Sequence, residues 1–285
     1  MGGKHVHAAW LIPLCMLAGA SLCGCASGPP APAPASAAEP ARGAWEPIGR
    51  SVSGRRIEAL TLPAPGPRAL IVGGIHGDEP EAQGAIDELA AHLASTRPNA
   101  TIRIVRDANP DGTAAGSRAN SRGIDLNRNW PARNFTPAPD RGPAPLSEPE
   151  TRALHREIVR FGPDLVIVCH SSPRGPFVNF DGPGAELAAA FATAAGRTDG
   201  RWRVVPEIGY ATPGSLGSYI GIDLGVPILT VELARSGAPE GARAALREGV
   251  SAVLREWGAG PVGGGPAPFR GRPDGPITGS RAPTR

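Results

Sequence analysis

Two histidines and one glutamate in this chain have the types and spacing of a catalytic zinc site. His76 and Glu79 form an H-x-x-E pair, and His170 follows an apolar run much later in the chain. Two imidazoles and a carboxylate leave a tetrahedral zinc ion one open position for water, as in catalytic rather than structural sites. The sequence therefore predicts one Zn²⁺ per chain and a hydrolytic reaction.

The residues around an H-x-x-E pair indicate whether it binds metal, because so short a motif also arises by chance. The apolar run 69–75 predicts a buried strand that ends at His76, and a helix is expected to begin near Pro80. Residues 164–169 predict a second buried strand, which ends at His170. Ligands usually meet an open α/β sheet at the carboxyl ends of its strands, so we expect both histidines at that edge.

A further carboxylate is expected at the same edge. Glu232 ends the apolar strand pattern 227–232, and a carboxylate buried there costs free energy unless it has a partner or a role. A base is needed to take a proton from the attacking water and pass it to the leaving amine. Glu232 is the candidate general base.

A long loop supplies candidate substrate-binding groups. It runs from Asn109 and contains Arg118 and the pair Asn127 and Arg128, and loops of this length inside a domain are usually functional. An arginine fork can hold a carboxylate through two hydrogen bonds. Arg128 with Asn127 is therefore expected to bind a terminal carboxylate of the substrate, and Arg118 to polarise the scissile carbonyl. Trp130 either lines the substrate groove or anchors this loop.

Taken together, these residues resemble the zinc carboxypeptidases of the pancreatic carboxypeptidase superfamily over roughly residues 45 to 257. The resemblance implies a zinc carboxypeptidase-like fold and the roles just given for the zinc ligands, the general base, the polarising arginine and the clamp. That family also closes a mobile tyrosine over bound substrate. Tyr210, which precedes Glu232 by 22 positions, is implied as this catalytic and substrate-binding residue, with Tyr219 as the alternative.

The segment after the second histidine resembles one branch of the superfamily. Ser171-Ser172-Pro173-Arg174-Gly175, together with 178–183 and 212–215, is similar to the murein peptide amidases, which cleave the bond between γ-D-glutamate and meso-diaminopimelate. The resemblance implies a peptidoglycan stem peptide with a free C-terminal carboxylate as substrate, and Gly217 is expected to leave room for a long side chain. The alternatives are a deacylase like aspartoacylase or succinylglutamate desuccinylase, and a lipoprotein that binds cell-wall peptide without cleaving it.

Strand patterns alternate with helix patterns, which predicts a single α/β domain. The expected architecture is a mixed, largely parallel twisted sheet of about eight strands with helices on both faces. Ser147 and Glu150 have the spacing of a capping box at the start of one helix, which should turn Leu154, Ile158 and Phe161 to one face. The predicted elements are a hairpin within 47–62, strands at 69–75, 101–106, 164–169, 202–205 and 227–232, and helices at 80–95, 147–161, 184–195 and 240–257.

Both ends of the chain have the composition of segments without a fold. Residues 1–24 have the pattern of a lipoprotein-type signal peptide that ends before Cys25, and 25–44 form a Pro/Ala-rich linker. The catalytic domain is then 45–258, and 259–285 form a Gly/Pro-rich tail. We expect an exported, periplasmic protein anchored to the outer membrane only by a lipid on Cys25.

Charge and cysteine content narrow the partners further. Lys+Arg number 29 and Asp+Glu 26, and the leader carries only Lys4, so the mature chain has 28 bases against 26 acids, a net charge of +2. A charge so close to zero predicts no nucleic-acid partner. Cys169 is the one cysteine outside the leader and the linker, and alternation along its strand should point it away from the side of His170.

Overall fold

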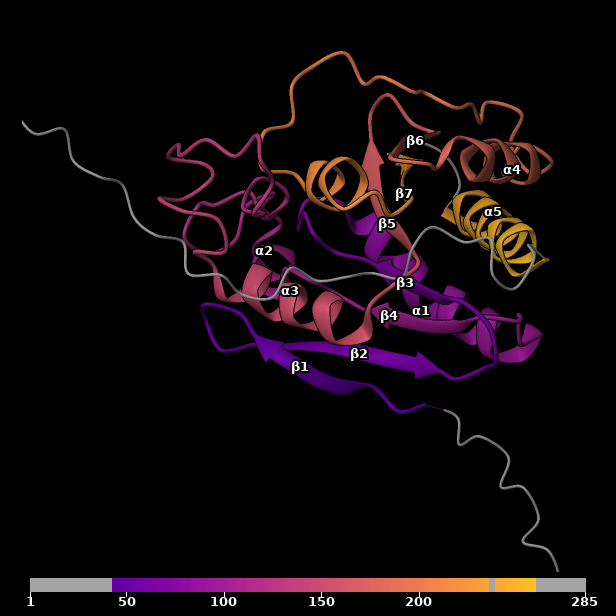
Figure 1. The fold of residues 1–285 in the computed structure, drawn as a ribbon, viewed down its shortest axis with the longest axis horizontal. Coiled ribbons are helices and arrows are strands. Elements are labelled where there is room, and N and C mark those ends of the chain that lie inside the picture. The colour runs from indigo at the N-terminus through magenta and orange to yellow at the C-terminus, as the bar shows by residue number, and fades with distance from the viewer. Residues whose placement is uncertain (1–42, 236–238, 260–285) are drawn as a thin grey trace, which may run out of the picture. The chain divides into compact units, whose positions relative to one another are not determined.

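The computed structural model describes residues 43–235 and 239–259, and its centre is a mixed sheet of seven strands (Figure 1). The strands follow the order β1-β2-β4-β3-β5-β7-β6. Their cores are apolar runs such as Leu70-Ile71-Val72, whose β-branched residues pack well on a pleated surface. The strands are β1 (Glu46–Arg50), β2 (Arg56–Leu62), β3 (Arg68–Val72), β4 (Thr101–Val105), β5 (Leu165–Ser172), β6 (Phe177–Asp181) and β7 (Ile228–Ala234).

The pairing is parallel in the middle of this sheet and antiparallel toward its edges. β4, β3, β5 and β7 are parallel neighbours, while β1 pairs with β2, β2 with β4, and β6 with β7 in antiparallel register. The predicted mixed sheet is thus confirmed, and its parallel part is the central four strands. The carboxyl ends of β3, β5 and β7 consequently lie at one edge.

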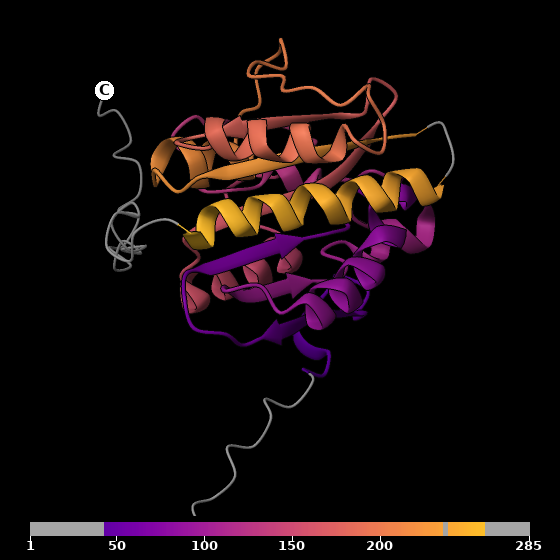
Figure 2. The same cartoon turned by 90° about the vertical axis from the view of Figure 1, so that its right-hand side faces the viewer.

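Helices cover both faces of the sheet (Figures 1 and 2). One core packs β-strand residues such as Ile71 and Ile167 against α1, α4 and α5, and the other packs Leu70 and Val166 against α3 and the loops beside it. This alternation follows from the two-residue period of a strand. The helical elements are α1 (Pro80–Thr96), α2 (Pro110–Ala115), η1 (Leu126–Arg128), α3 (Pro149–Phe161), α4 (Ala185–Ala195), η2 (Ser218–Asp223) and α5 (Pro239–Ala259).

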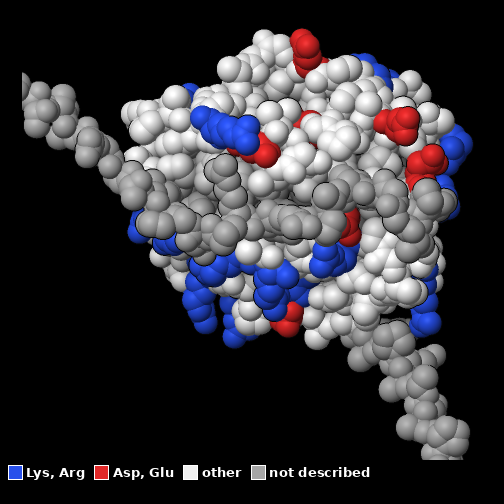
Figure 3. Space-filling model, viewed as in Figure 1, with Lys and Arg blue, Asp and Glu red and all other residues white. Residues whose placement is uncertain are grey.

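Helix α3 is amphipathic as the sequence predicts, but its start differs from the prediction. Leu154 and Ile158 are buried in the second core, and arginines gather on the outer face over α3 and the β1–β2 hairpin (Figure 3). The helix begins at Pro149, and its N-cap, Glu148, makes no side-chain cap hydrogen bond. The predicted capping box of Ser147 and Glu150 is therefore wrong, because Pro149 takes the first helical position and moves the N-cap from Ser147 to Glu148.

Three further expectations about the elements are corrected. The described residues hold seven strands rather than about eight, and the predicted strand 202–205 contributes only a single bridge, from Val204 to Val178. The edge strand β6 was not predicted, since Pro and Gly flank its five residues. The long loop also contains the short helices α2 and η1.

Several predictions fall outside the described residues. These are the signal peptide at 1–24, Cys25 with its lipid, most of the linker, and all but the first residue of the tail. Among the residues that the structure describes, no helix is long and apolar enough to cross a membrane.

Candidate active site

The zinc-site residues come from the β3–α1 turn, the start of α1 and the strand β5. His76 lies in the turn between β3 and α1, and Glu79 is the N-cap residue directly before α1. His170 lies within β5, and its register partner on the parallel strand β7 is Glu232. Gly77 lets this turn pack against α2, because a Cβ at this position would lie 1.9 Å from the carbonyl carbon of Gly112.

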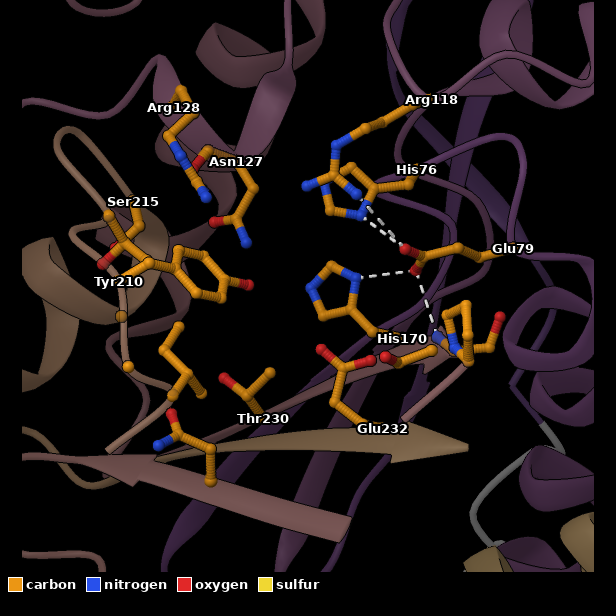
Figure 4. A pocket seen from close by; sticks show the side chains of 18 of the residues that line it. His76, Glu79, Arg118, Asn127, Arg128, His170, Tyr210, Ser215, Thr230 and Glu232 are labelled. Carbon is orange, nitrogen blue, oxygen red and sulfur yellow. Dashed lines mark hydrogen bonds and ion pairs between the residues drawn. The ribbon is translucent and has the colours of Figure 1, made fainter. Parts of the chain in front are cut away.

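His76, Glu79 and His170 form a compact set of metal-binding groups. These residues are 3%, 4% and 2% exposed, and one donor atom from each lies within 4.8 Å of the others. Nδ1 of His76 lies 2.9 Å from Glu79 Oε1, and Nδ1 of His170 lies 2.8 Å from Glu79 Oε2 (Figure 4). Two imidazole nitrogens and a carboxylate at this spacing can coordinate one zinc ion, whose bonds to N and O are about 2 Å long.

Asp125 supports His76 from the other side, a contact that the sequence did not predict. Its Oδ1 lies 3.1 Å from His76 Nε2, and its Oδ2 accepts a hydrogen bond from Arg118 Nε at 3.0 Å. Asp125 also accepts from the backbone N–H of Asn127, which fixes the start of η1. A carboxylate on the outer nitrogen of a metal-ligating histidine sets its tautomer and orientation.

The electrostatics of this cluster favour a bound cation. Burial by itself raises the pKa of the Glu79 carboxyl, but the two histidines outweigh it and lower that pKa well below the usual range. Burial lowers the pKa of His76, whereas its hydrogen bonds to Asp125 and Glu79 raise it overall. Burial also raises the pKa of the Asp125 carboxyl, but His76, Arg118 and Arg128 outweigh it and lower that pKa overall. Glu79 and Asp125 therefore both stay ionised and favour positive charge at the site.

Glu232 differs from the other carboxylates in this region. Burial raises the pKa of its carboxyl above the ordinary value, helped by the negative charge of Glu79 and opposed by His170, His76 and Arg118. Figure 4 shows it beside His170, facing the same cavity. A carboxyl whose pKa moves toward neutrality is suited to exchange protons during a reaction.

Arg118, Asn127 and Arg128 line the same cavity, as the sequence predicts for a substrate-binding loop. Asn127 Oδ1 accepts a hydrogen bond from the N–H of Leu216 at 3.0 Å, so its amide NH₂ group is left for the cavity. Arg128 Nη1 donates to the carbonyl of Asn127 at 2.7 Å. In Figure 4 these two side chains lie on the side of the histidines opposite to Glu79.

The two candidate tyrosines occupy different environments. Tyr210 lines the cavity, is 59% exposed, and points its hydroxyl toward His170 (Figure 4). Tyr219 stacks on Trp130 with ring centroids 6.0 Å apart, and its hydroxyl lies 3.1 Å from His155 Nε2. Trp130 is 1% exposed and anchors the long loop through its backbone hydrogen bond to Gly214. Of the two tyrosines, only Tyr210 faces the cavity.

The cavity extends past the metal-binding cluster to Asp181, an acidic residue to which the sequence analysis gave no role. It has a volume of about 860 Å³ and includes Asp181, at the end of β6, and Gly217. A Cβ on Gly217 would lie 2.2 Å from Asp181 Oδ2, so this glycine leaves the carboxylate its room. Burial raises the pKa of the Asp181 carboxyl, and no hydrogen bond or ion pair to it is found among the described residues.

Comparison with known proteins places these features in a family context. The family model for zinc carboxypeptidases matches residues 35–181, a range that ends before Tyr210 and Glu232. Murein peptide amidase A of Escherichia coli (strain K12) is 34% identical over 218 residues, which cover 67% of this chain and 83% of that protein. The Vibrio campbellii protein of the same name is 30% identical over 184 residues, covering 58% and 69%.

Solved structures agree with this match. The crystal structure of murein-tripeptide amidase from Escherichia coli O157 has a TM-score of 0.57 and 30% identity, and covers 74% of this chain and 91% of that one. Bovine thrombin-activatable fibrinolysis inhibitor has a TM-score of 0.64 at 17% identity, with coverage of 76% and 91%. At that identity the second likeness concerns the fold alone.

Proposed function

Because the chain belongs to the zinc carboxypeptidase family and is a peptide hydrolase of the murein peptide amidase type, we propose that it hydrolyses the γ-D-glutamyl–meso-diaminopimelate bond of peptidoglycan stem peptides. The observation that carries this proposal is the joint arrangement of a metal-binding triad, the half-buried acid Glu232 and an amide–guanidinium pair around one cavity. Such a cavity offers a place for the scissile bond between groups that activate water and groups that bind a carboxylate.

Zinc held by His76, Glu79 and His170 supplies a Lewis acid that polarises a carbonyl and makes water a nucleophile near neutral pH. Glu232 accepts the proton of the attacking water and delivers it to the nitrogen of the leaving amine. Arg118 donates to the carbonyl oxygen as negative charge develops there.

The leaving residue is held on the other side of the cavity. Asn127 and Arg128 bind its carboxylate, with the geometric selectivity of a guanidinium fork. Tyr210 closes over the bound residue, a motion that its exposed position permits. These groups restrict cleavage to a bond next to a free carboxylate.

Asp181 supports diaminopimelate as the leaving residue. The far end of this amino acid carries an ammonium group and a carboxylate. Asp181 lines the cavity and makes no ion pair among the described residues, so it is suited to bind the ammonium group. Gly217 leaves space for a long side chain to reach it. Leaving residues with short or apolar side chains would leave this carboxylate without a partner.

The direct test is mass-spectrometric analysis of L-Ala-γ-D-Glu-meso-diaminopimelate after incubation with the zinc-loaded protein. We expect release of free diaminopimelate, lost after chelation and in Glu232→Ala. Intact tripeptide would refute the proposed substrate. Cleavage of N-acyl amino acids instead would favour the deacylase alternative, and zinc binding without turnover of any of these compounds would favour a protein that only binds cell-wall peptide.

We also propose that the protein is exported and anchored to the outer membrane by a lipid on Cys25. The first support is the sequence pattern of residues 1–25, which is that of a lipoprotein signal peptide. The second is that an enzyme anchored there would lie near its peptidoglycan-derived substrate. Fractionation of cells that produce the wild type and Cys25→Ala tests this. Equal recovery of both forms in the membrane fraction would refute the lipid anchor.

A further inference from the structure

A third arginine of the cavity, Arg235, has no part in the mechanism described above. It lies three residues beyond Glu232, just after the end of β7, and lines the same cavity with 31% of its side chain exposed. Its Nε donates to the carbonyl of Ser171 at 3.3 Å, and its Nη2 lies 3.4 Å from Asp78 Oδ2 and 3.6 Å from Glu79 Oε1.

Arg235 lies at the opposite end of the metal-binding cluster from Arg128. Figure 4 shows Glu79 on one side of the two histidines and Arg128 with Tyr210 on the other, and Arg235 contacts Glu79. If Arg128 binds the residue that leaves, Arg235 borders the part of the substrate on the other side of the scissile bond. The cavity therefore has a guanidinium at each end.

The guanidinium of Arg235 has bonding capacity to spare. Its printed contacts, from 3.3 to 3.6 Å, are longer than the 2.7–2.9 Å typical of charge-assisted hydrogen bonds. A guanidinium has five N–H donors, and within the described part of the chain no hydrogen bond or ion pair uses Nη1 of Arg235. An incoming carboxylate can therefore bind there while the contact to Ser171 is kept.

A γ-linked glutamyl residue brings such a carboxylate to this place. Because its amide is formed by the side-chain carboxyl, its α-carboxylate stays free, four bonds from the scissile carbonyl carbon. Single bonds of about 1.5 Å put the two carbons about 5 Å apart in an extended chain. A nitrogen 3.6 Å from an oxygen of the metal ligand Glu79 lies within that reach. An α-linked peptide with a neutral residue on the acyl side has no carboxylate at this position.

We propose that Arg235 binds the α-carboxylate of the γ-linked acidic residue on the acyl side and so selects substrates that carry a carboxylate four bonds from the scissile carbonyl carbon over substrates with a neutral group there. This inference rests on the proposed function. Asp78 makes the need for a cation stronger, since without Arg235 the carboxylate of the substrate would face the carboxylate of Asp78. Arg235 is thus a specificity-determining residue rather than a member of the water-activating set.

The test pairs a change in the enzyme with a change in the substrate. The zinc-loaded full chain and Arg235→Gln are assayed on L-Ala-γ-D-Glu-meso-diaminopimelate and on the analogue whose glutamyl α-carboxylate is a carboxamide. Losing a charged hydrogen bond predicts a fall of about 10- to 100-fold in kcat/KM on the carboxylate substrate, mainly through KM. On the carboxamide, the variant and the wild type should differ by about twofold at most.

Arg133→Gln is the matched control, because the Arg133 side chain is 75% exposed and does not line the cavity. It should behave as the wild type on both substrates. Equal losses of kcat/KM on both substrates in Arg235→Gln would overturn the inference. If that variant also held less than one zinc ion per chain, the loss would come from weaker zinc binding through Glu79. A wild type that cleaves neither compound would overturn the proposed function as well, which is a distinct result.

Discussion

Replacing Asp125 by asparagine tests whether this side chain holds the zinc ligand His76 in place. The carboxylate lies 3.1 Å from His76 Nε2 and accepts from Arg118 Nε at 3.0 Å. Asparagine keeps the shape and one acceptor oxygen but removes the negative charge, and its NH₂ group cannot accept from Arg118. Both partners then lose the ion that orients them.

The expected size of the effect follows from the burial of this contact. Asp125 is 9% exposed and His76 is 3% exposed, so water cannot replace the lost carboxylate. Changing the outer partner of a metal-ligating histidine typically weakens metal binding by about 10- to 100-fold. At about 1.4 kcal/mol per factor of ten, that is about 1.4 to 2.8 kcal/mol of zinc-binding free energy.

The assay is the zinc dissociation constant, measured by competition with a chromophoric chelator, which does not depend on turnover. Asp140→Asn is the matched control, because the Asp140 side chain is 63% exposed and its ion pair is with the neighbouring Arg141. We expect the wild type and Asp140→Asn to bind zinc equally and Asp125→Asn to bind more weakly. Equal affinity in all three folded proteins would refute the positioning role of Asp125.

Three further predictions concern single side chains. Glu232→Gln should keep one zinc ion per chain but lower kcat by about 10²- to 10⁴-fold; undiminished kcat would contradict its role as base. Burial raises the pKa of Asp181, so the folded state holds that proton more tightly than the unfolded chain, and the contribution of Asp181 to stability falls as pH rises above its ordinary range. Asp181→Asn should therefore melt at or above the wild-type temperature at pH 7 but bind the diaminopimelate peptide less well. The measured quantity is the Tm of the variant minus that of the wild type, and a smaller value at pH 7 than at pH 4 would argue against this reasoning. Burial raises the pKa of the Cys169 thiol to about 12, so iodoacetamide at pH 8 should label this residue only after unfolding, as peptide mass spectrometry can show.

Much of the site could be predicted because its signals are local. The zinc histidines and Glu232 each follow an apolar run, and strands in a parallel sheet bring their carboxyl ends to one edge. Alternation along β5 likewise places Cys169 in the core on the opposite face from the neighbouring side chains, as expected. The parts of the fold that were mispredicted are short or irregular, such as β6, where five residues carry too little pattern.

The amino-acid sequence by itself predicted the metal-binding residues and the layered architecture, because periodicity and strand ends are properties of neighbouring residues, and it supplied Glu232, Asn127 and Arg128 as candidates for the general base and the carboxylate clamp. Only the tertiary structure decided that Asp125 supports His76 from 49 positions away, that Tyr210 rather than Tyr219 faces the cavity, and that Asp181 and Arg235 join the site. Those contacts depend on how loops pack on the finished sheet. The spacing of residues along the chain does not encode such packing.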